Sequence, residues 1–584
     1  MRAGDGRFLG LCIGLGVVMG LFTLGAGFFQ EDFAHLLSLQ HTADWRDRLS
    51  SYMMPGMFWF NYDTTHVQLF RPLPIVVLSI DQALFGSRAL LFHIHSVLWY
   101  CAWLVTALLL LRTVLERTAW RFAGIMLVLS ATPVVATTVI SARYALLTAV
   151  FSAAAIALHV MWREYGFRIL APVAILAYIL GLLTSELTIA AVGFIAAYEF
   201  VRAVTTVVAT PTARGFFTAL GSLLLGTAPV AIVSAIYLAT YSLTGHGGGG
   251  SDIYIIPFED PVRFLAVFPA RFMLAIGTMF TGMSIEPLIS AETISDAGLD
   301  RLLRVIEVAG VVFVILLAIL SRRFWGTMLP TQRRAFAWLL LGACLASIAS
   351  TPNLPMPRML ILATCGLLGA VGILFSLAMA EWQRGTLAKR HTAMLALIAA
   401  VFFVVQPITW VGQASLLTWH FGLQRKLALA AELENTPEHT PVFVVCTDRP
   451  LAALSIPVIR RYHGLSAAYN WDVISLMTGP HTLERDEDAA FILAPESGTF
   501  LDGFLHQVFW SERYPFAPGD VRQGRGYEVE VLETSDGRPT RIRVRFPESL
   551  DSENYRFVTF LDGELRLVEM PPSGGSLLLQ SKGR

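Results

Sequence analysis

The sequence predicts a polytopic α-helical membrane protein that carries a C-terminal α+β domain. Of its 584 residues, 55% are hydrophobic and only 15% are charged, whereas soluble proteins carry about 25% charged residues. Apolar runs long enough to cross a bilayer recur over the first 410 positions. From residue 413 onwards charged residues become frequent and the apolar runs become short. We therefore expect a membrane domain over 1–412 and a separate domain over 413–584.

About eleven membrane spans are expected. They lie near residues 8–29, 89–111, 121–140, 143–161, 168–184, 186–202, 215–242, 303–320, 335–350, 358–380 and 391–412. Arg2 and Arg7 precede the first run, which is longer than the core of a signal peptide and has no clear small-x-small cleavage site after it. We interpret it as an uncleaved membrane helix.

Basic residues give the orientation of these spans. With the N-terminus inside, every inner loop is basic, as the positive-inside rule requires. These loops hold Arg112, Arg117 and Arg121; Arg163 and Arg168; Arg202 and Arg214; Arg322, Arg323, Arg333 and Arg334; and Arg384, Lys389 and Arg390. We therefore expect a cytoplasmic N-terminus, extracytoplasmic loops over 30–88 and 243–302, and an extracytoplasmic C-terminal domain. This arrangement fits an integral protein of a bacterial inner membrane.

The segment 69–85 decides the orientation of all later spans. It is apolar at its centre but contains Arg71, Pro72, Pro74 and Asp81. Its continuous apolar stretch is shorter than the ~20 residues that a span needs. We interpret the segment as an interfacial helix on the outer membrane surface.

The C-terminal domain shows strand and hairpin signals. A buried strand at 441–446 and a helix at 451–462 form a βα unit, and a further strand is expected at 489–493. Two hairpins are expected, one over 527–546 and one over 556–568. No motif in this domain points to a particular chemistry.

Composition argues against nucleic-acid binding and against a disulfide or zinc framework. Lys and Arg together number 43, as do Asp and Glu, and there is no basic tail. Of the five cysteines, only Cys446 lies outside the apolar spans, and no zinc-ligand spacing occurs. The lipid bilayer is therefore an expected partner, and no nucleic acid is.

Two adjacent acids, Glu31 and Asp32, directly follow the first apolar run. Carboxylates at the mouth of a membrane helix are costly to hold near hydrocarbon. They could mark a water-facing helix end. Alternatively, one is a general base for an acceptor hydroxyl, with its pKa raised towards neutrality by the low dielectric. Asp32 is favoured as this base; the second acid could orient the acceptor or hold a divalent cation, and no other cofactor is indicated.

Arg71 and two histidines near the outer membrane surface are further candidates. Arg71, held by the proline that follows it, suits an anionic head group but could also be a snorkelling anchor. His93 and His95 open the second span, and because they are two residues apart they make a poor metal pair. His35, which follows the acid pair, and His93 are candidate substrate-binding residues.

Three more charges break the local pattern on the outer side. Arg143 lies at a tight hairpin, Glu186 stands in a long uncharged stretch, and Arg358 ends a proline-rich turn. Each could be a helix-end anchor. Because Arg71 lies on the same face, the four charges together favour a shared cavity.

A glycine run at 247–250 lies in the long outer loop. Glycine runs bind phosphate in a strand–loop–helix setting, but here a mobile loop or lid is expected. Asp252, Glu259 and Asp260 follow the run and could bring a further acid to the site.

The order of these motifs resembles the membrane part of the GT-C glycosyltransferase superfamily over roughly residues 8–380. The likeness is greatest to the protein O-mannosyltransferase-like branch and its bacterial relatives with tetratricopeptide repeats. The motifs are, in order, Glu31-Asp32, the Arg71-Pro72-Leu73 segment that ends near Phe85-Gly86, the start of the second span with His93, Pro133 followed by Ser141-Ala142-Arg143, and the turn with Arg358.

The resemblance implies a hexosyltransferase that uses a polyprenyl-phosphate sugar as donor on the outer face. The acceptor would be a hydroxyl of a protein or a glycan. Asp32 or Glu31 would be the base, and Arg71, Arg143 and Arg358 would bind the donor phosphate.

Two departures from the family pattern bear on the site. Thr132-Pro133 stands where relatives often have His-Pro, and Ser185-Glu186 stands where they often have Lys-Glu. The second change removes a donor-side cation and leaves the substrate-binding role of Glu186 open. No tetratricopeptide repeats occur, so the acceptor does not carry over from those relatives.

Two other classes of function remain open. A transporter or lipid flippase would show internal repeats and charges at the membrane midplane, whereas the exceptional charges here lie at outer helix ends. A non-catalytic envelope scaffold would use the C-terminal domain for binding. Convergence of the exceptional charges in one pocket would favour the enzyme.

Overall fold

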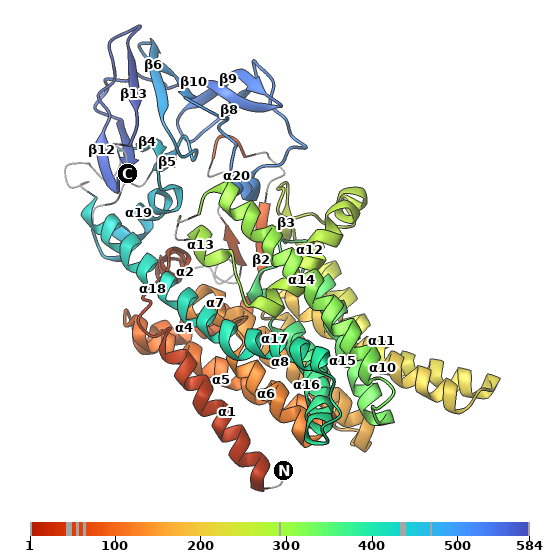
Figure 1. Cartoon of the computed structure of the whole chain (residues 1–584). Helices are drawn as coiled ribbons and strands as arrows, with labels where there is room; N and C mark the ends of the chain where they lie inside the picture. Colours follow the sequence, from red (N-terminus) through yellow and green to blue (C-terminus); the bar gives the residue numbers. More distant parts are fainter. Residues whose placement is uncertain are drawn as a thin grey trace.

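Helices form the membrane part of the chain, and β-sheets dominate the C-terminal part. The computed structural model describes residues 3–41, 50–53, 58–61, 66–290, 292, 294–431, 440–465, 467 and 470–581. In these ranges nine helices are long and apolar enough to cross a membrane. Figure 1 shows the C-terminal sheets at one end of the helical bundle and the N-terminus at the other end. The expected fold class is confirmed.

The helices and strands have the following bounds. The helices are α1 (Ala3–Leu21), α2 (Gln30–His41), α4 (Pro72–Phe85), α5 (Ala89–Val114), α6 (Arg117–Leu129), α7 (Val134–Thr138), η1 (Ser141–Arg143), α8 (Tyr144–Tyr165), α9 (Leu170–Leu182), η2 (Glu186–Ile189), α10 (Ala190–Ala209), α11 (Ala213–Leu243), α12 (Pro261–Thr281), α13 (Glu286–Ser290), α14 (Asp296–Phe324), α15 (Pro330–Ile348), η3 (Pro357–Met359), α16 (Ile361–Gln383), α17 (Lys389–Ala400), η4 (Val401–Val405), α18 (Gln406–Ala430), α19 (Pro450–Tyr462) and α20 (Phe504–Phe509). The strands are β1 (Ser50–Met53), β2 (His66–Phe70), β3 (Gly247–Gly249), β4 (Val442–Thr447), β5 (Trp471–Val473), β6 (His481–Glu487), β7 (Ala490–Pro495), β8 (Val521–Gln523), β9 (Glu528–Ser535), β10 (Arg538–Arg545), β11 (Arg556–Leu561), β12 (Glu564–Leu567) and β13 (Ser576–Leu579).

The continuous helix expected over 121–140 is broken in the structure. Helix α6 ends before Pro133, and the short helix α7 begins after it. Proline lacks a backbone N–H and disfavours helix in the residue before it. The side-chain oxygen of Gln406 in α18 accepts the backbone N–H of Ala131 at 2.9 Å, so this N–H group has a partner at the break. The prediction of one unbroken helix is therefore wrong, and the break leads the chain into the turn η1.

Helix α12 lies within 243–302, the loop in which no span is expected. Its length and composition would allow it to cross a membrane. Asp260, directly before it, pairs with Arg513 of the C-terminal domain. Glu292, shortly after it, accepts the N–H of Leu451 in the same domain at 2.7 Å. The segment that contains α12 therefore begins and ends on the side of the C-terminal domain. The expectation that this segment holds no long helix is wrong.

Close packing against α14 fixes the position of α12. A Cβ atom on Gly277 would lie 1.9 Å from the carbonyl oxygen of Ile306, and one on Gly310 would lie 2.3 Å from that of Met273. Small residues allow helix backbones to approach in this way. The two glycines therefore let α12 and α14 form a common wall.

A small antiparallel sheet joins the loop over 30–88 to the loop over 243–302. Strand β2 lies between β1 and β3, and β3 is part of the glycine run. Residues 247–249 of the run therefore form a strand rather than a loop. Because Arg71 directly follows β2, the sheet also ties the second outer loop to Arg71.

The C-terminal domain contains two sheets. A six-stranded antiparallel sheet has the order β13-β6-β7-β10-β9-β8, and a four-stranded sheet has the order β12-β11-β4-β5. Strand β4 pairs in parallel with both β5 and β11. The expected βα unit (β4 and α19) and the two expected hairpins (β9–β10 and β11–β12) are confirmed.

Candidate active site

The acid pair at the start of α2 is joined to the turn η1. One carboxylate oxygen of Asp32 accepts the backbone N–H of Phe29 at 2.8 Å, and the other accepts that of Ser141 at 2.6 Å. The hydroxyl of Ser141 donates to Glu31 at 3.3 Å. One serine therefore contacts both acids, although 109 residues separate it from Asp32.

The two acids have different surroundings. Asp32 is 1% exposed, and burial raises its pKa to about 6 although its two backbone hydrogen bonds act in the opposite direction. Glu31 is half-buried and, among the described residues, is bonded through one oxygen. It lies four residues before His35, so both side chains share one face of α2. Burial lowers the pKa of His35, which keeps its imidazole neutral at pH 7.

Arg143 is held by several buried partners. It forms an ion pair with Asp81, and the two side chains are 4% and 1% exposed. It also donates to the hydroxyl of Ser96 and to the carbonyl oxygen of Phe92, both at 2.9 Å. Asp81 has a second partner, since Nδ1 of His95 lies 2.6 Å from its other oxygen. Arg143 therefore has few N–H groups left for a ligand.

Two arginines from distant segments flank the ring of Tyr144. The guanidinium carbon of Arg71 lies 3.7 Å from the ring centroid, and that of Arg358 lies 6.0 Å from it. Arg71 pairs with Glu186 at 2.8 Å, and Arg358 pairs with Glu286 at 2.9 Å. The negative face of the aromatic ring attracts both cations, so this arrangement brings two positive charges close together.

Each of these two arginines has a buried N–H group without a hydrogen-bond partner among the described residues. The groups are Nε of Arg71 and Nε of Arg358, and one carboxylate oxygen of Glu186 and one of Glu286 also lack partners there. Buried polar atoms are normally bonded, and an unpaired donor is costly. Such atoms indicate a place where water or the oxygens of a ligand complete the site.

A small cavity connects these groups. It has a volume of about 40 Å³ and is lined by His35, Arg71, Ser141, Arg143 and Tyr144, together with apolar residues of α4 and α8 and the one before η1. Pockets that bind small molecules usually measure about 300–1,000 Å³. A sugar phosphate can therefore enter only if the surrounding elements move apart.

Most of the residues predicted for the site come together in the structure. His35, Arg71 and Arg143 line the cavity. Glu31 and Asp32 reach it through Ser141. Glu186 reaches it through Arg71, and Arg358 through Tyr144. His93 does not join them. Its Nε2 lies 2.7 Å from the carbonyl oxygen of Gly27, in the turn before α2, so it contacts the chain that leads to the acid pair.

Sequence reasoning missed three side chains that hold this arrangement. Tyr144 stands next to Arg143 at the same hairpin, which was the available signal. Asp81 was visible as a single acid in an apolar segment, and the structure makes it the partner of Arg143. Glu286 shows no signal in the sequence, because its role depends on a contact with Arg358 across 72 residues of chain.

The carboxylate oxygens of Glu31 and Asp32 are poorly placed to bind the divalent cation that the sequence suggests. Both oxygens of Asp32 already accept backbone N–H groups, whereas one oxygen of Glu31 has no hydrogen-bond partner among the described residues. In the part of the chain that the structure describes, no group of three or more His, Cys, Asp or Glu side chains could hold a metal ion.

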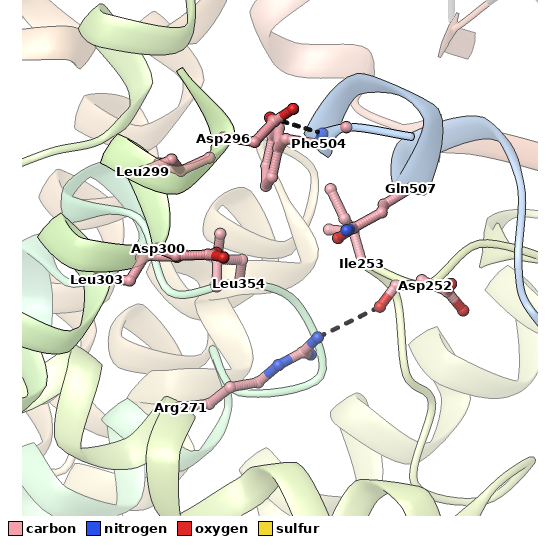
Figure 2. Close-up of a pocket in the computed structure, with 11 residues that line it drawn as sticks. Asp252, Ile253, Arg271, Asp296, Leu299, Asp300, Leu303, Leu354, Phe504 and Gln507 are labelled. Atoms are coloured by element: carbon pink, nitrogen blue, oxygen red, sulfur yellow. Dashed lines mark hydrogen bonds between the residues drawn. The ribbon is translucent and has the colours of Figure 1, made fainter. Parts of the chain in front are cut away.

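A second cavity, of about 190 Å³, lies where the helices meet the C-terminal domain. Figure 2 shows Arg271 directed towards the backbone of Asp252, and Asp296 next to Phe504. Arg271 also donates to two carbonyl oxygens of the turn after α15, at 3.0 Å each. Asp296 accepts the backbone N–H of Phe504 at 3.3 Å. These charged groups are used to hold the two parts of the chain together.

Replacing Asp252 by Ala is expected to loosen this junction. Its carboxylate accepts hydrogen bonds from Ser511 and Arg263 at 2.7 Å and from the N–H of Glu512 at 3.2 Å. Their loss should lower the free energy of unfolding by about 1–3 kcal/mol, measured as a lower midpoint of thermal unfolding in detergent. Asp300→Ala is the control, because Asp300 lines the same cavity and has no ion-pair partner in the described ranges. Equal midpoints for the two variants would contradict this role.

Comparison with known proteins gives distant structural likenesses. No protein-family model matches the chain, and no curated protein matches it. The Archaeoglobus fulgidus oligosaccharyltransferase, solved with a tethered acceptor peptide, has 12% identity and a TM-score of 0.42 over 81% of this chain and 64% of its own. ArnT from Cupriavidus metallidurans, solved with undecaprenyl phosphate, has 12% identity and a TM-score of 0.37 over 93% of this chain and 98% of its own.

A third solved structure, the arabinosyltransferase EmbB from Mycobacterium smegmatis, has 13% identity and a TM-score of 0.30 over 89% of this chain and 46% of its own. The chain thus spans about 64% of the oligosaccharyltransferase and less than half of EmbB. At these identities and TM-scores the likenesses assign neither a family nor an activity to the chain.

Proposed function

We propose that the protein is a membrane glycosyltransferase that moves a hexose from a polyprenyl-phosphate carrier to an acceptor hydroxyl of a protein or glycan. The observation that carries the proposal is the pair of arginines beside Tyr144. Arg71 and Arg358 each have a buried N–H group that lacks a partner among the described residues. Phosphate oxygens are the acceptors that such charged donors bind best. The apolar residues of α4 border the same cavity, so the carrier chain can remain in the bilayer.

The arginines act on the leaving group. The acceptor oxygen attacks the anomeric carbon, the bond between this carbon and the phosphate oxygen breaks, and its electron pair stays on the phosphate. Arg71 and Arg358 stabilise the charge that develops there, because their ion pairs and the ring of Tyr144 already hold their N–H groups in place. In-line attack inverts the anomeric carbon.

Glu31 takes the proton of the acceptor hydroxyl. The sequence favours Asp32 for this role, but Asp32 is 1% exposed and each of its oxygens already accepts a backbone N–H. Glu31 is more exposed, has a free oxygen, and shares a helix face with His35, which lines the cavity. Asp32 positions Glu31 by holding the turn at Ser141.

Removing either arginine charge is expected to weaken transfer. Arg71→Gln and Arg358→Gln should each lower kcat/KM for a labelled polyprenyl-phosphate hexose by about 10- to 100-fold, because a hydrogen bond to a charged group contributes ~1.5–3 kcal/mol. The measurement is transfer of label by the purified protein in lipid vesicles. Arg88→Gln is the matched control, since Arg88 is an exposed arginine just before α5 that does not line the cavity.

Two results would contradict the proposal. One is unchanged transfer in both glutamine variants, which would remove the arginines from phosphate binding. The other is movement of labelled lipid across vesicles by the unaltered protein without any transfer product, which would favour a flippase.

Transfer is expected to decrease at acidic pH. The pKa of Asp32 is raised by burial to about 6, so the anion predominates at pH 7 and is lost as the pH falls through 6. Protonation removes an acceptor for the N–H of Phe29 or Ser141, which loosens the turn that holds Glu31. The measurement is kcat between about pH 5 and pH 8, where the rate should follow the deprotonated fraction. A step near pH 6 that persists in Asp32→Asn would exclude Asp32 as its origin.

A further inference from the structure

An apolar groove lies on the helical bundle away from the candidate active site. Helices α12, α14, α15 and α16 form it, and its volume is about 390 Å³, within the usual range of ligand sites, about 300–1,000 Å³. Its lining is apolar except at one end, where Ser321 and Arg322 lie next to Trp325. No residue lines both this groove and the cavity that contains Arg71.

The length of the groove corresponds to one leaflet of a bilayer. Along α14 and the residue after it the lining extends from Phe313 to Trp325, which at 1.5 Å per residue is about 18 Å. The hydrocarbon core of a bilayer is about 30 Å thick, so one leaflet contributes roughly 15 Å. Neighbouring side chains of α14, such as Ile315 and Ile319, are 53% and 40% exposed, as expected of a helix that faces lipid.

The polar end of the groove carries a free cation. Arg322 is exposed and has no ion-pair partner among the described residues, whereas its neighbour Arg323 pairs with Glu381 at 2.9 Å. Trp325, next to it, is 45% exposed. Tryptophan and arginine together are typical of the membrane–water interface. Because the other end of α14 contacts the C-terminal domain through Asp296, this interface is the one opposite that domain.

We propose that the groove binds an acyl chain of an anionic phospholipid whose head group pairs with Arg322. Basic pockets between transmembrane helices bind anionic lipid head groups. An apolar channel one leaflet long fits one chain, and a single cation at its mouth selects a negative head group over a zwitterionic one. The glycines that bring α12 against α14 also shape this groove, because Met273 and Phe313 line it from the two helices.

Photolabelling in lipid nanodiscs tests the proposal. The full-length protein is reconstituted with trace phosphatidylglycerol or phosphatidylcholine that carries a diazirine in one acyl chain, and the labelled peptides are mapped. Phosphatidylglycerol should label α14 and α15 preferentially. Ala318→Trp, which fills the groove, should reduce this labelling at least fivefold, whereas Ile319→Trp should not, because Ile319 is outside the lining.

The cation is tested separately from the groove. Arg322→Gln should lower the preference for phosphatidylglycerol over phosphatidylcholine about fivefold, which corresponds to the roughly 1 kcal/mol that one basic residue contributes near an anionic surface. Arg334→Gln, an exposed arginine outside the lining, should leave the preference unchanged. Labelling spread evenly over all lipid-facing helices would overturn the proposal. So would equal labelling in the two tryptophan variants, an unchanged preference in Arg322→Gln, or cross-linking of a second copy of the chain through α14.

Discussion

Replacing Glu31 by Gln is expected to lower kcat for sugar transfer by about 10²- to 10⁴-fold, the usual contribution of a positioned general base. Glutamine has nearly the same shape but cannot take up the proton of the acceptor hydroxyl at neutral pH. The KM for the donor should change little, because the two arginines that meet its phosphate are unaltered. The measurement is initial-rate transfer from a labelled polyprenyl-phosphate hexose at saturating acceptor.

Two further variants make this result specific. Glu259→Gln changes an exposed acid of the second outer loop and should keep full activity. Asp32→Asn should also lower kcat, but together with a lower midpoint of thermal unfolding, because an amide NH₂ would then face a backbone N–H. If Glu31→Gln stays active while Asp32→Asn folds normally and is inactive, Asp32 is the base and the assignment of the two roles is reversed.

Replacing Arg143 by Met is expected to lower the free energy of unfolding by about 3–5 kcal/mol, because it leaves a buried charge without its main partner. That charge is Asp81, which is 1% exposed and, among the described residues, would retain His95 as its one side-chain partner. Methionine fills similar space, so the loss reports the ion pair rather than a cavity. Unfolding of the purified protein in detergent, followed by temperature or denaturant, gives the value.

The double variant Asp81→Leu/Arg143→Met separates structure from substrate binding. Replacing both partners of a buried ion pair by apolar residues is often neutral or stabilising, so the double variant should recover most of the stability. If instead Arg143→Met folds with normal stability and has a raised KM for the donor, Arg143 binds the donor phosphate, as the family resemblance implies.

The fold class was accessible from the sequence because its signals are local. Span-length apolar runs give membrane helices wherever they lie. In the C-terminal domain, the turns Asp536-Gly537 and Asp562-Gly563 place the hairpins β9–β10 and β11–β12. Asp536 and Asp562 both have positive φ, about 50° and 55°, a conformation that short polar residues adopt more readily than others.

Other parts of the fold depended on distant contacts. The break at Pro133 is stabilised by Gln406, which is more than 270 residues away. Helix α12 contains two prolines and two arginines, which hide it from a search for apolar runs, and its position depends on the contact of Gly277 with α14. Neither contact leaves a local pattern.

The candidate site was predicted in its members but not in its pairings. Two arginines against the positive-inside trend and one acid in a long uncharged stretch pointed to Arg143, Arg358 and Glu186, because a charge held near a membrane requires a partner. Which partner each has could not be read, since the ion pair of Arg71 with Glu186 spans 115 residues. The ring of Tyr144 between two cations is a further contact that only packing reveals.

The three-stranded sheet β1-β2-β3 joins the loop over 243–302 to the strand that leads into Arg71. Gly247, Gly248 and Gly249 pair with β2, and Arg71 is the residue after β2. A loop that swings away to enlarge the cavity must either break this pairing or carry Arg71 with it. An acceptor that favours one position of the loop would then change the affinity for the carrier phosphate. Because such coupling is reciprocal, the phosphate would change the affinity for the acceptor by the same factor. The two substrates would then bind cooperatively without touching each other.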